Sequence, residues 1–224
     1  PASDEPDRVA EAIQRMGLLH AVLTMVARDD LADGGMLHVA QCVTAIRKVS
    51  PLTRIETLIS DVKGTDALDI LLAVKPDVLN HNIETVARLQ RAVRPSAGYA
   101  RSLSVLARAK AADLTAKSGL IMGMGETLEE AEGTLVDLAG VGVDIVTIGQ
   151  YLRPTTHHLP VARWVEPAEF DHLKKFGEAL GISHVESSPL TRSSYHARQS
   201  AEEAEQKSID TAVSLTRKPQ PAHK

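Results

Sequence analysis

Cysteine is almost absent from this sequence: the 224 residues include a single one, Cys42. One cysteine excludes a disulfide within the chain, so a reducing cytoplasm is the expected location. It also excludes a zinc or iron–sulfur site built from cysteines of this chain alone, because such sites need several thiolates. Cys42 falls in an expected helix, where a small buried apolar residue is its simplest role.

Aromatic side chains, excess basic charge and long apolar runs are also scarce. One Trp, three Tyr and two Phe leave little for stacking on nucleic-acid bases. Lys plus Arg number 25 against 29 Asp plus Glu, so the basic face of a nucleic-acid-binding protein is not expected. No apolar run approaches the roughly 18 residues of a membrane span, and no N-terminal secretory signal is recognisable. We therefore expect neither nucleic acid nor a membrane as a partner.

Short strand patterns alternate with helix patterns along most of the chain. Buried strands are expected over 20–27, 54–59, 77–81, 115–122, 143–148 and 182–186. Helices are expected over 5–17, 34–48, 66–74, 84–92, 99–112, 127–138 and 167–180, the sixth opened by a T-x-x-E capping box. This alternation predicts an α/β fold with a parallel sheet covered by helices.

A partial parallel β/α barrel, similar to a TIM barrel, is favoured over an open doubly wound sheet, because no G-x-G-x-x-G follows the first strand pattern. The chain opens on the helix pattern over 5–17, so the expected barrel lacks its first strand. Residues 1–198 form this expected domain. Residues 199–224 are polar, contain Pro219 and Pro221 and lack clear periodicity, which predicts a disordered polar tail.

Polar or glycine-rich clusters follow five of the expected strands. They are Arg28 to Asp30 with Asp33 to Gly35, Ser60-Asp61, Asn80 to Asn82 with Glu84, Gly123 to Glu126, and Gln150-Tyr151. In β/α barrels the working groups gather at the C-terminal ends of the strands. We therefore expect these clusters to form a binding site.

Several of these residues also have a purely structural interpretation. Asp29 and Asp30 are acids of the kind found where helices begin, and Asp33 suits a helix cap. Glu126 favours a helix N-terminus. His81 is more often a hydrogen-bonded structural histidine than a ligand.

Basic residues of the pattern leave alternatives open as well. Lys117, within an expected strand, is either paired to a barrel carboxylate or a Schiff-base lysine of the aldolase type. Arg94 and Arg101 are either surface charges or a clamp for a carboxylate.

Taken together, six segments resemble the lipoyl synthase family of radical S-adenosylmethionine (SAM) enzymes. They are VARDDLADGG (26–35), PDVLNHNIETV (76–86), VRPSAGYARSL (93–103), TAKSGLIMGMGET (115–127), DIVTIGQYLRPTTHHLPV (144–161) and PLTRSSYHA (189–197). They occur in the family's order over nearly all of residues 5–197. The closing RSSY is the most specific of them.

The resemblance implies a partial β/α barrel and a sulfurtransferase activity. The family uses one 4Fe–4S cluster to cleave SAM to a 5′-deoxyadenosyl radical, which abstracts hydrogen from C6 and C8 of an octanoyl chain. A second 4Fe–4S cluster donates the two sulfur atoms and is consumed. The octanoyl chain is amide-linked to a lysine of a lipoyl carrier domain, so the implied partners are E2 subunits of 2-oxoacid dehydrogenases and the glycine cleavage H protein.

The resemblance also implies a set of cofactor-binding residues. They are Asp33, Gly34 and Gly35 at the turn that receives the methionine amine, Asn80, Asn82 and Glu84 at the ribose, and Gly119, Ile121, Gly123 and Glu126 of the family's G-x-I-x-G-x-x-E pattern. Glycines in that pattern let the backbone approach the adenosine closely.

A serine of the RSSY segment is the implied metal ligand. In the family a serine oxygen binds the auxiliary cluster, and we assign this role to Ser194, with Ser193 as the runner-up. An oxygen ligand holds iron more weakly than a thiolate, which suits a cluster that must release sulfur. The structural alternative for Ser194 is a helix cap or turn hydroxyl.

The chain departs from the family in its cysteines. The family has three for the auxiliary cluster and a C-x-x-x-C-x-x-C for the radical cluster, and both sets would lie upstream of Pro1, since Cys42 matches neither. We therefore expect a C-terminal fragment that is inactive alone. Two other hypotheses stay open: a non-catalytic remnant or binding module for nucleotide or lipoyl carrier domain, and a Lys117 aldolase.

Overall fold

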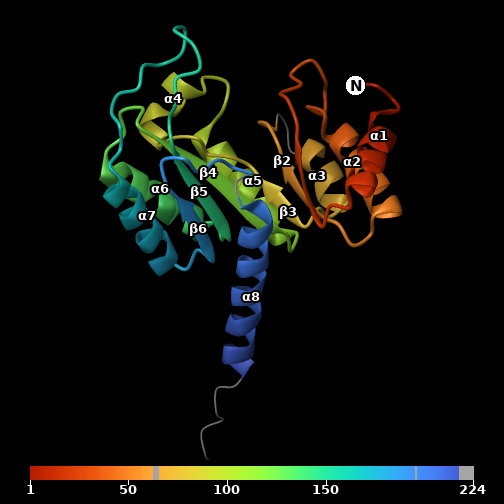
Figure 1. Cartoon of the computed structure of the whole chain (residues 1–224). Helices are drawn as coiled ribbons and strands as arrows, with labels where there is room; N and C mark the ends of the chain where they lie inside the picture. Colours follow the sequence, from red (N-terminus) through yellow and green to blue (C-terminus); the bar gives the residue numbers. More distant parts are fainter. Residues whose placement is uncertain (63–65, 195, 217–224) are drawn as a thin grey trace, which may run out of the picture.

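The computed structural model describes residues 1–62, 66–194 and 196–216, and a single six-stranded sheet runs through it (Figure 1). The strands are β1 (His20–Thr24), β2 (Arg54–Leu58), β3 (Val78–Asn80), β4 (Thr115–Met122), β5 (Ile145–Gln150) and β6 (His184–Ser187). They lie in the order of the sequence, and each pairs in parallel with the next. The predicted parallel sheet is confirmed.

Helices precede, connect and follow the strands. They are α1 (Glu5–Met16), α2 (Met36–Val49), α3 (Asp66–Ala73), the 3-10 helix η1 (Ala87–Leu89), α4 (Gln90–Val93), α5 (Tyr99–Ala111), α6 (Leu128–Gly140), α7 (Pro167–Ala179) and α8 (Ala197–Thr216). Within the parts of the chain that the structure describes, no helix is both long and apolar enough to cross a bilayer.

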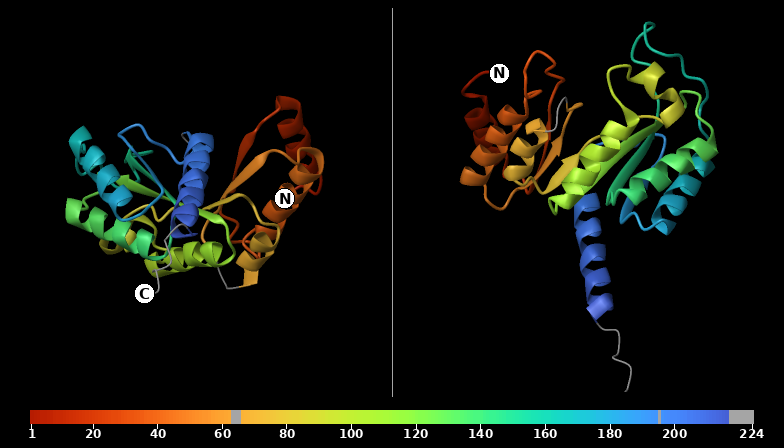
Figure 2. Two further views of the ribbon diagram at one scale, coloured as in Figure 1. Left: turned by 90° about the horizontal axis from the view of Figure 1, so that it is seen from below. Right: turned by 180° about the vertical axis from the view of Figure 1, so that it is seen from behind.

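The main hydrophobic core lies between the outer face of the sheet and the connecting helices. Leu106 of α5 and Phe170 of α7 are buried there with the strand residues Leu79 and Val146. Seen from below, the strands and connecting helices form a curved wall, with α8 on its inner side (Figure 2, left). This arrangement is the predicted partial β/α barrel, and β1 and β6 are its two edges.

The C-terminal segment differs from its prediction. The expectation of a disordered tail over 199–224 is wrong for residues 199–216, which belong to α8, while 217–224 lie outside the described residues. Ala201 and Ala204 of α8 are buried against Val78 and Ile145 on the inner face of the sheet. Alanine and glutamate are strong helix formers. The small side chains of the two alanines let the helix approach the strands closely.

The segment after β3 also differs from its prediction. A helix was expected over 84–92, but helical structure begins at Ala87. Glu84 instead forms a parallel bridge with Leu120 of β4, because its amide donates to the Gly119 carbonyl and its own carbonyl accepts from Ile121, both at 2.9 Å. These two hydrogen bonds extend the sheet beyond β3 and fix Glu84 beside β4.

The predicted capping box at the start of α6 is confirmed. The Thr127 hydroxyl accepts from the Glu130 amide at 3.2 Å, and the Glu130 carboxylate accepts from the Thr127 amide at 2.9 Å. We expect Thr127→Ala to lower the free energy of unfolding by about 1 kcal/mol, because one amide at the helix start loses its acceptor. Urea unfolding measures this change. Thr127→Ser keeps the oxygen and should stay close to the wild type; equal losses in both variants would contradict the capping role.

Candidate functional site

A cavity of about 360 Å³ opens at the carboxyl ends of β3, β4 and β5. Its lining includes Asn82, Glu84, Gly119, Ile121, Thr147, Gly149, Gln150, Tyr151, Thr191, Arg192 and Ser193. Gly119 and Ile121 belong to the G-x-I-x-G-x-x-E pattern and reach the cavity from β4. Asn82 and Glu84 reach it from the segment after β3. The structure thus brings these four predicted residues to one cavity.

Glu84 holds a backbone conformation that non-glycine residues rarely adopt. Its φ is +66°, in the left-handed region, where a non-glycine residue costs on the order of 1–3 kcal/mol. The bridge to β4 holds it there, with its carboxylate at the cavity. Burial raises the pKa of Glu84 above its ordinary value, while the hydrogen bond from Asn82 opposes that shift.

Asn82 presents an unsatisfied acceptor in the same cavity. Its Nδ2 donates to Glu84 Oε1 at 3.1 Å, whereas its Oδ1 is buried and has no hydrogen-bond partner. A buried amide oxygen without a donor is costly, so this atom suits a ligand that carries a hydroxyl or N–H group. A Cβ on Gly119 would lie only 2.7 Å from that oxygen, so glycine keeps the space beside it open.

The other two residues of the pattern shape the loop beside the cavity. The buried Glu126 carboxylate accepts from the amides of Gly123, at 2.6 Å, and Met124, at 2.9 Å. Gly123 has a φ of +104°, and a Cβ there would lie 2.7 Å from the Arg163 carbonyl oxygen. Glu126 and Gly123 therefore fix the chain after β4, and neither lines the cavity itself.

Asn80 lies one layer deeper in the barrel than Asn82. It is in register with Lys117, two residues before Gly119, and its Nδ2 donates to Glu56 Oε1 at 2.8 Å. Lys117 Nζ lies 2.9 Å and 3.1 Å from the two Glu56 oxygens, and both side chains are 0% exposed. Of the two interpretations of Lys117, the structure shows the one paired to a barrel carboxylate.

The Asp33 to Gly35 turn lies at the other side of the barrel, between β1 and α2. The Asp33 carboxylate accepts from the amides of Gly35 at 3.0 Å and Leu37 at 2.8 Å, so it binds free amides where α2 begins, but the N-cap residue is Gly35 and not Asp33 as predicted. Gly34 and Gly35 have φ values of +62° and +90°. Gly35 lines a separate cavity of about 370 Å³ beside β1, so this turn and the Asn82–Glu84 segment do not share one cavity.

Thr147, Gly149 and Thr191 line the cavity but were missed by the sequence interpretation. Thr147 and Gly149 are in register with Gly119 and Ile121, so alternate residues of β5 face the same side as the recognised pattern. That period-2 alternation was a usable signal. Thr191 carried no such signal, because only the fold brings its loop against β5.

Comparisons with known proteins identify the family of this site. The sequence profile of the Radical SAM superfamily matches residues 2–138. Lipoyl synthase of Chlorobaculum tepidum is 53% identical over 199 residues, which cover 88% of this chain and 69% of that protein. Lipoyl synthase of Rubrobacter xylanophilus is 53% identical over 204 residues, covering 90% and 64%. This chain belongs to the lipoyl synthase family.

Solved structures agree with the fold of this lipoyl synthase family member. Streptococcus suis SuiB superposes with a TM-score of 0.62 at 10% identity, over 83% of this chain and 42% of that one. At this identity the likeness concerns the fold alone. This chain spans 64% of the length of the Rubrobacter xylanophilus lipoyl synthase. The activity of the whole protein therefore applies to this chain only as a proposal.

The residues at the cavity fit the adenosyl part of SAM. A ribose carries hydroxyl groups that can donate hydrogen bonds. Asn82 Oδ1 has no donor, and the Glu84 carboxylate can accept further hydrogen bonds, so both suit a ribose. The backbone of Gly119, without a side chain, leaves room for a flat ring nearby. The fit rests on this orphan oxygen, on the neighbouring carboxylate and on the space that glycine leaves.

The residues of this chain do not fit the family's iron–sulfur clusters. Cys42 is buried on α2, and a 4Fe–4S cluster takes four ligands, mostly thiolates. Among the described residues, no three His, Cys, Asp or Glu side chains are grouped so that they could hold a metal ion. The described residues therefore do not supply the ligand set of a 4Fe–4S cluster.

The predicted ligand Ser194 lies in the turn between β6 and α8. Its side chain is exposed and does not line the cavity, whereas the runner-up Ser193 is half-buried and does. Tyr195, the last residue of RSSY, lies outside the described residues. The assignment of Ser194 in this lipoyl synthase family member stays a prediction.

Proposed function

We propose that this chain is the adenosyl-binding part of a lipoyl synthase, which inserts two sulfur atoms at C6 and C8 of a protein-bound octanoyl-lysine. The proposal is supported by family membership over about nine-tenths of the chain. The structural observation that carries it is the unpartnered Asn82 Oδ1 beside the Glu84 carboxylate in one cavity. A reducing cytoplasm is the proposed compartment, in keeping with the single cysteine of the chain.

This chain's contribution is to bind and orient the nucleoside. Asn82 Oδ1 accepts a hydrogen bond from one ribose hydroxyl, and the Glu84 carboxylate accepts one from the other. The buried Oδ1 thereby gains the donor that it lacks, and the half-buried Glu84 gains a further one. When bound, SAM supplies the radical chemistry that activates the octanoyl chain. The fixed positions of Asn82 and Glu84 then determine where the adenosyl group points.

The adenosyl site is tested by titrating the chain with S-adenosylhomocysteine, a stable relative of SAM, in a calorimeter. We expect saturable binding of one ligand per chain. Glu84→Gln keeps the size of the side chain but removes its charge, and should weaken binding about tenfold, because hydrogen bonds to charged groups are the stronger ones. Glu178→Gln on the exposed face of α7 is the matched control and should bind as the wild type does. Absence of binding to the wild-type chain would overturn the adenosyl site.

A second candidate function is a non-catalytic binding module, which would bind the nucleoside without catalysing sulfur insertion. The observation that favours this alternative is the single buried Cys42. We expect anaerobic reconstitution with iron and sulfide to load no stable 4Fe–4S cluster on the chain alone, while S-adenosylhomocysteine still binds. Iron analysis and the visible absorption spectrum measure the first point, and a stoichiometric cluster would contradict it.

The proposed partners are octanoylated lipoyl carrier domains, namely E2 subunits and the glycine cleavage H protein. They follow from the proposed reaction, whose substrate chain is carried on a lysine of such a domain. Co-sedimentation of this chain with octanoylated and unmodified H protein tests them. Preferential retention of the octanoylated form supports the proposal, and equal or absent retention of both forms counts against it.

A further inference from the structure

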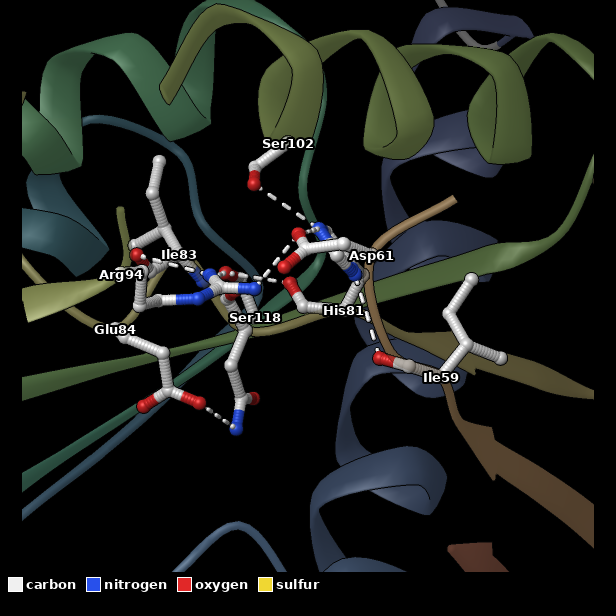
Figure 3. A network of polar contacts seen from close by, with 9 residues as sticks. Ile59, Asp61, His81, Ile83, Glu84, Arg94, Ser102 and Ser118 are labelled. Atoms are coloured by element: carbon white, nitrogen blue, oxygen red, sulfur yellow. Dashed lines mark hydrogen bonds and ion pairs between the residues drawn. The ribbon is translucent and has the colours of Figure 1, made fainter. Parts of the chain in front are cut away.

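Behind the cavity, a polar network supports the segment that carries Asn82 and Glu84 (Figure 3). Asp61 comes from the segment after β2, His81 from the segment after β3, and Arg94 follows α4 directly. Arg94 Nη2 donates to Asp61 Oδ1 at 2.7 Å, and both side chains are about four-fifths buried, at 19% and 20% exposure. Arg94 is therefore not a surface charge. Of its two predicted roles it has that of a clamp for a carboxylate, and the carboxylate is Asp61 of the same chain.

The second arm of the Arg94 guanidinium grips the turn backbone. Its Nη1 donates to the Asn82 carbonyl at 2.8 Å and lies 3.5 Å from the Ile83 carbonyl oxygen. These are the two carbonyls immediately before Glu84, whose φ of +66° is strained. A planar fork with donors on both arms can hold a carboxylate and a carbonyl at once, which a lysine ammonium cannot reproduce.

The other side of the same turn is held by Ser118 of β4. Its hydroxyl donates to the His81 carbonyl at 3.0 Å and accepts from the Ile83 amide at 3.1 Å. The turn is therefore fixed from two directions, by β4 on one side and by Arg94 on the other. Strained backbone of this kind persists only where the surroundings hold it in place.

His81 does not neutralise the Asp61 carboxylate, which is paired with Arg94 instead. The imidazole is buried, with Nε2 3.0 Å from the Ser102 hydroxyl and 3.8 Å from Asp61 Oδ1. Burial, and then the nearby Arg94, lower the pKa of His81 to about 4. The imidazole is thus neutral near pH 7, and Arg94 is the cation in contact with the Asp61 carboxylate.

We propose that Arg94, anchored by Asp61, is a positioning residue that holds the Asn82–Glu84 turn in its strained form and so sets the recognition of a ribose. The part concerning the ribose rests on the function proposed above. Arg94 is not among the residues that line the cavity, and it acts through the carbonyls of Asn82 and Ile83. Its loss should therefore act on two measurable properties, the protection of the turn and the discrimination between nucleosides.

Hydrogen exchange tests the first property without any ligand. In Arg94→Lys and in Asp61→Asn, the amides of Glu84 and Ile121 should exchange about tenfold faster or more, because local opening of the bridge becomes easier. Amides of β5 should be unchanged. Arg91→Lys, at an exposed arginine three residues earlier, is the matched control and should match the wild type. If protection at Glu84 and Ile121 is the same in Arg94→Lys as in Arg91→Lys, the inference is overturned.

A pair of nucleosides tests the second property. The wild type and Arg91→Lys should bind 5′-deoxyadenosine more tightly than 2′,5′-dideoxyadenosine, which lacks one ribose hydroxyl. In Arg94→Lys the dissociation constant for 2′,5′-dideoxyadenosine, divided by that for 5′-deoxyadenosine, should fall towards one. A general loss of stability would not cause this change. Increased exchange with an unchanged ratio overturns the positioning role. If the wild type binds neither nucleoside, the proposed function fails, and the exchange experiment still decides whether Arg94 holds the turn.

Discussion

Replacing Lys117 with methionine should lower the free energy of unfolding by about 3–5 kcal/mol, because it leaves the Glu56 carboxylate buried without its cation. Glu56 and Lys117 are both 0% exposed, and Nζ lies within 3.1 Å of both carboxylate oxygens. Methionine fills a similar volume, so the loss reports on charge more than on packing. Urea unfolding followed by circular dichroism measures the change.

The pH dependence of this loss distinguishes an unpaired charge from a cavity. Burial alone would raise the pKa of Glu56, but contacts with His20, Lys117 and Asn80 outweigh it and hold the pKa below the ordinary 4.5. In the wild type this pair therefore contributes stability above about pH 4.5, which is lost as the pH falls through the lower folded pKa. Without Lys117 the folded state prefers a protonated Glu56. The deficit of the variant should thus shrink as the pH falls, starting above 4.5, where Glu56 of the variant takes up its proton, and ending at the lowered pKa of Glu56 in the wild type.

Two further variants serve as controls for the Lys117 experiment. Lys110→Met removes a lysine whose Nζ lies 2.7 Å from Asp144, but at a half-exposed position, so it should cost about 1 kcal/mol or less. Glu56→Leu combined with Lys117→Met removes both charges and should be less destabilised than Lys117→Met alone. Equal losses in the two lysine variants, or a deficit independent of pH, would contradict the buried ion pair as its cause.

Local patterns predicted much of this fold because their causes are local. Strand β4 has the predicted bounds, Thr115–Met122, and the capping box of α6 depends on two residues three positions apart. The partner of Lys117 lies 61 residues away, so the sequence could indicate a carboxylate but not Glu56. Helix α8 was missed because Ala201 and Ala204 are buried against strands that lie far earlier in the chain.

The candidate site divides in the same way. Gly119 and Ile121 were predicted from a short family motif that begins in β4, and they line the cavity with Asn82 and Glu84. Asn80 was grouped with Asn82 and Glu84 because the three are close in sequence, yet its register with Lys117 places it in the layer below. The bridge of Glu84 to Leu120 overrides a local helix pattern, which a sequence window cannot reveal.

Gly149→Ala should both destabilise the protein and close part of the cavity. A Cβ on Gly149 would overlap the carbonyl oxygen of Thr191, a buried backbone group that cannot rotate away as a flexible side chain could. The Ser188 amide also donates to the Ile148 carbonyl at 3.1 Å, so this loop is attached to β5 next to the new methyl group. Overpacking of this kind costs about 1–3 kcal/mol, and we expect a loss in that range from urea unfolding.

The effect of Gly149→Ala on binding follows from where the strain is relieved. Thr191 and Ser193 line the cavity, so a shift of their loop changes its wall. We expect S-adenosylhomocysteine to bind about tenfold more weakly or worse, which corresponds to about 1.4 kcal/mol. Gly133→Ala is the matched control, because Gly133 is exposed within α6 and a Cβ there meets no atom within 4 Å.

The two glycine variants should change stability in opposite directions. Alanine at Gly133 restricts the unfolded chain and favours the helix, so it should raise the free energy of unfolding by about 0.4–1 kcal/mol and leave binding unchanged. A Gly149→Ala protein that is as stable as the wild type and binds S-adenosylhomocysteine as tightly would show that the Thr191 loop yields at no cost. In that case the loop would not form part of the adenosyl site, and the wall of the cavity would have to be assigned to β4 and the Asn82–Glu84 segment alone.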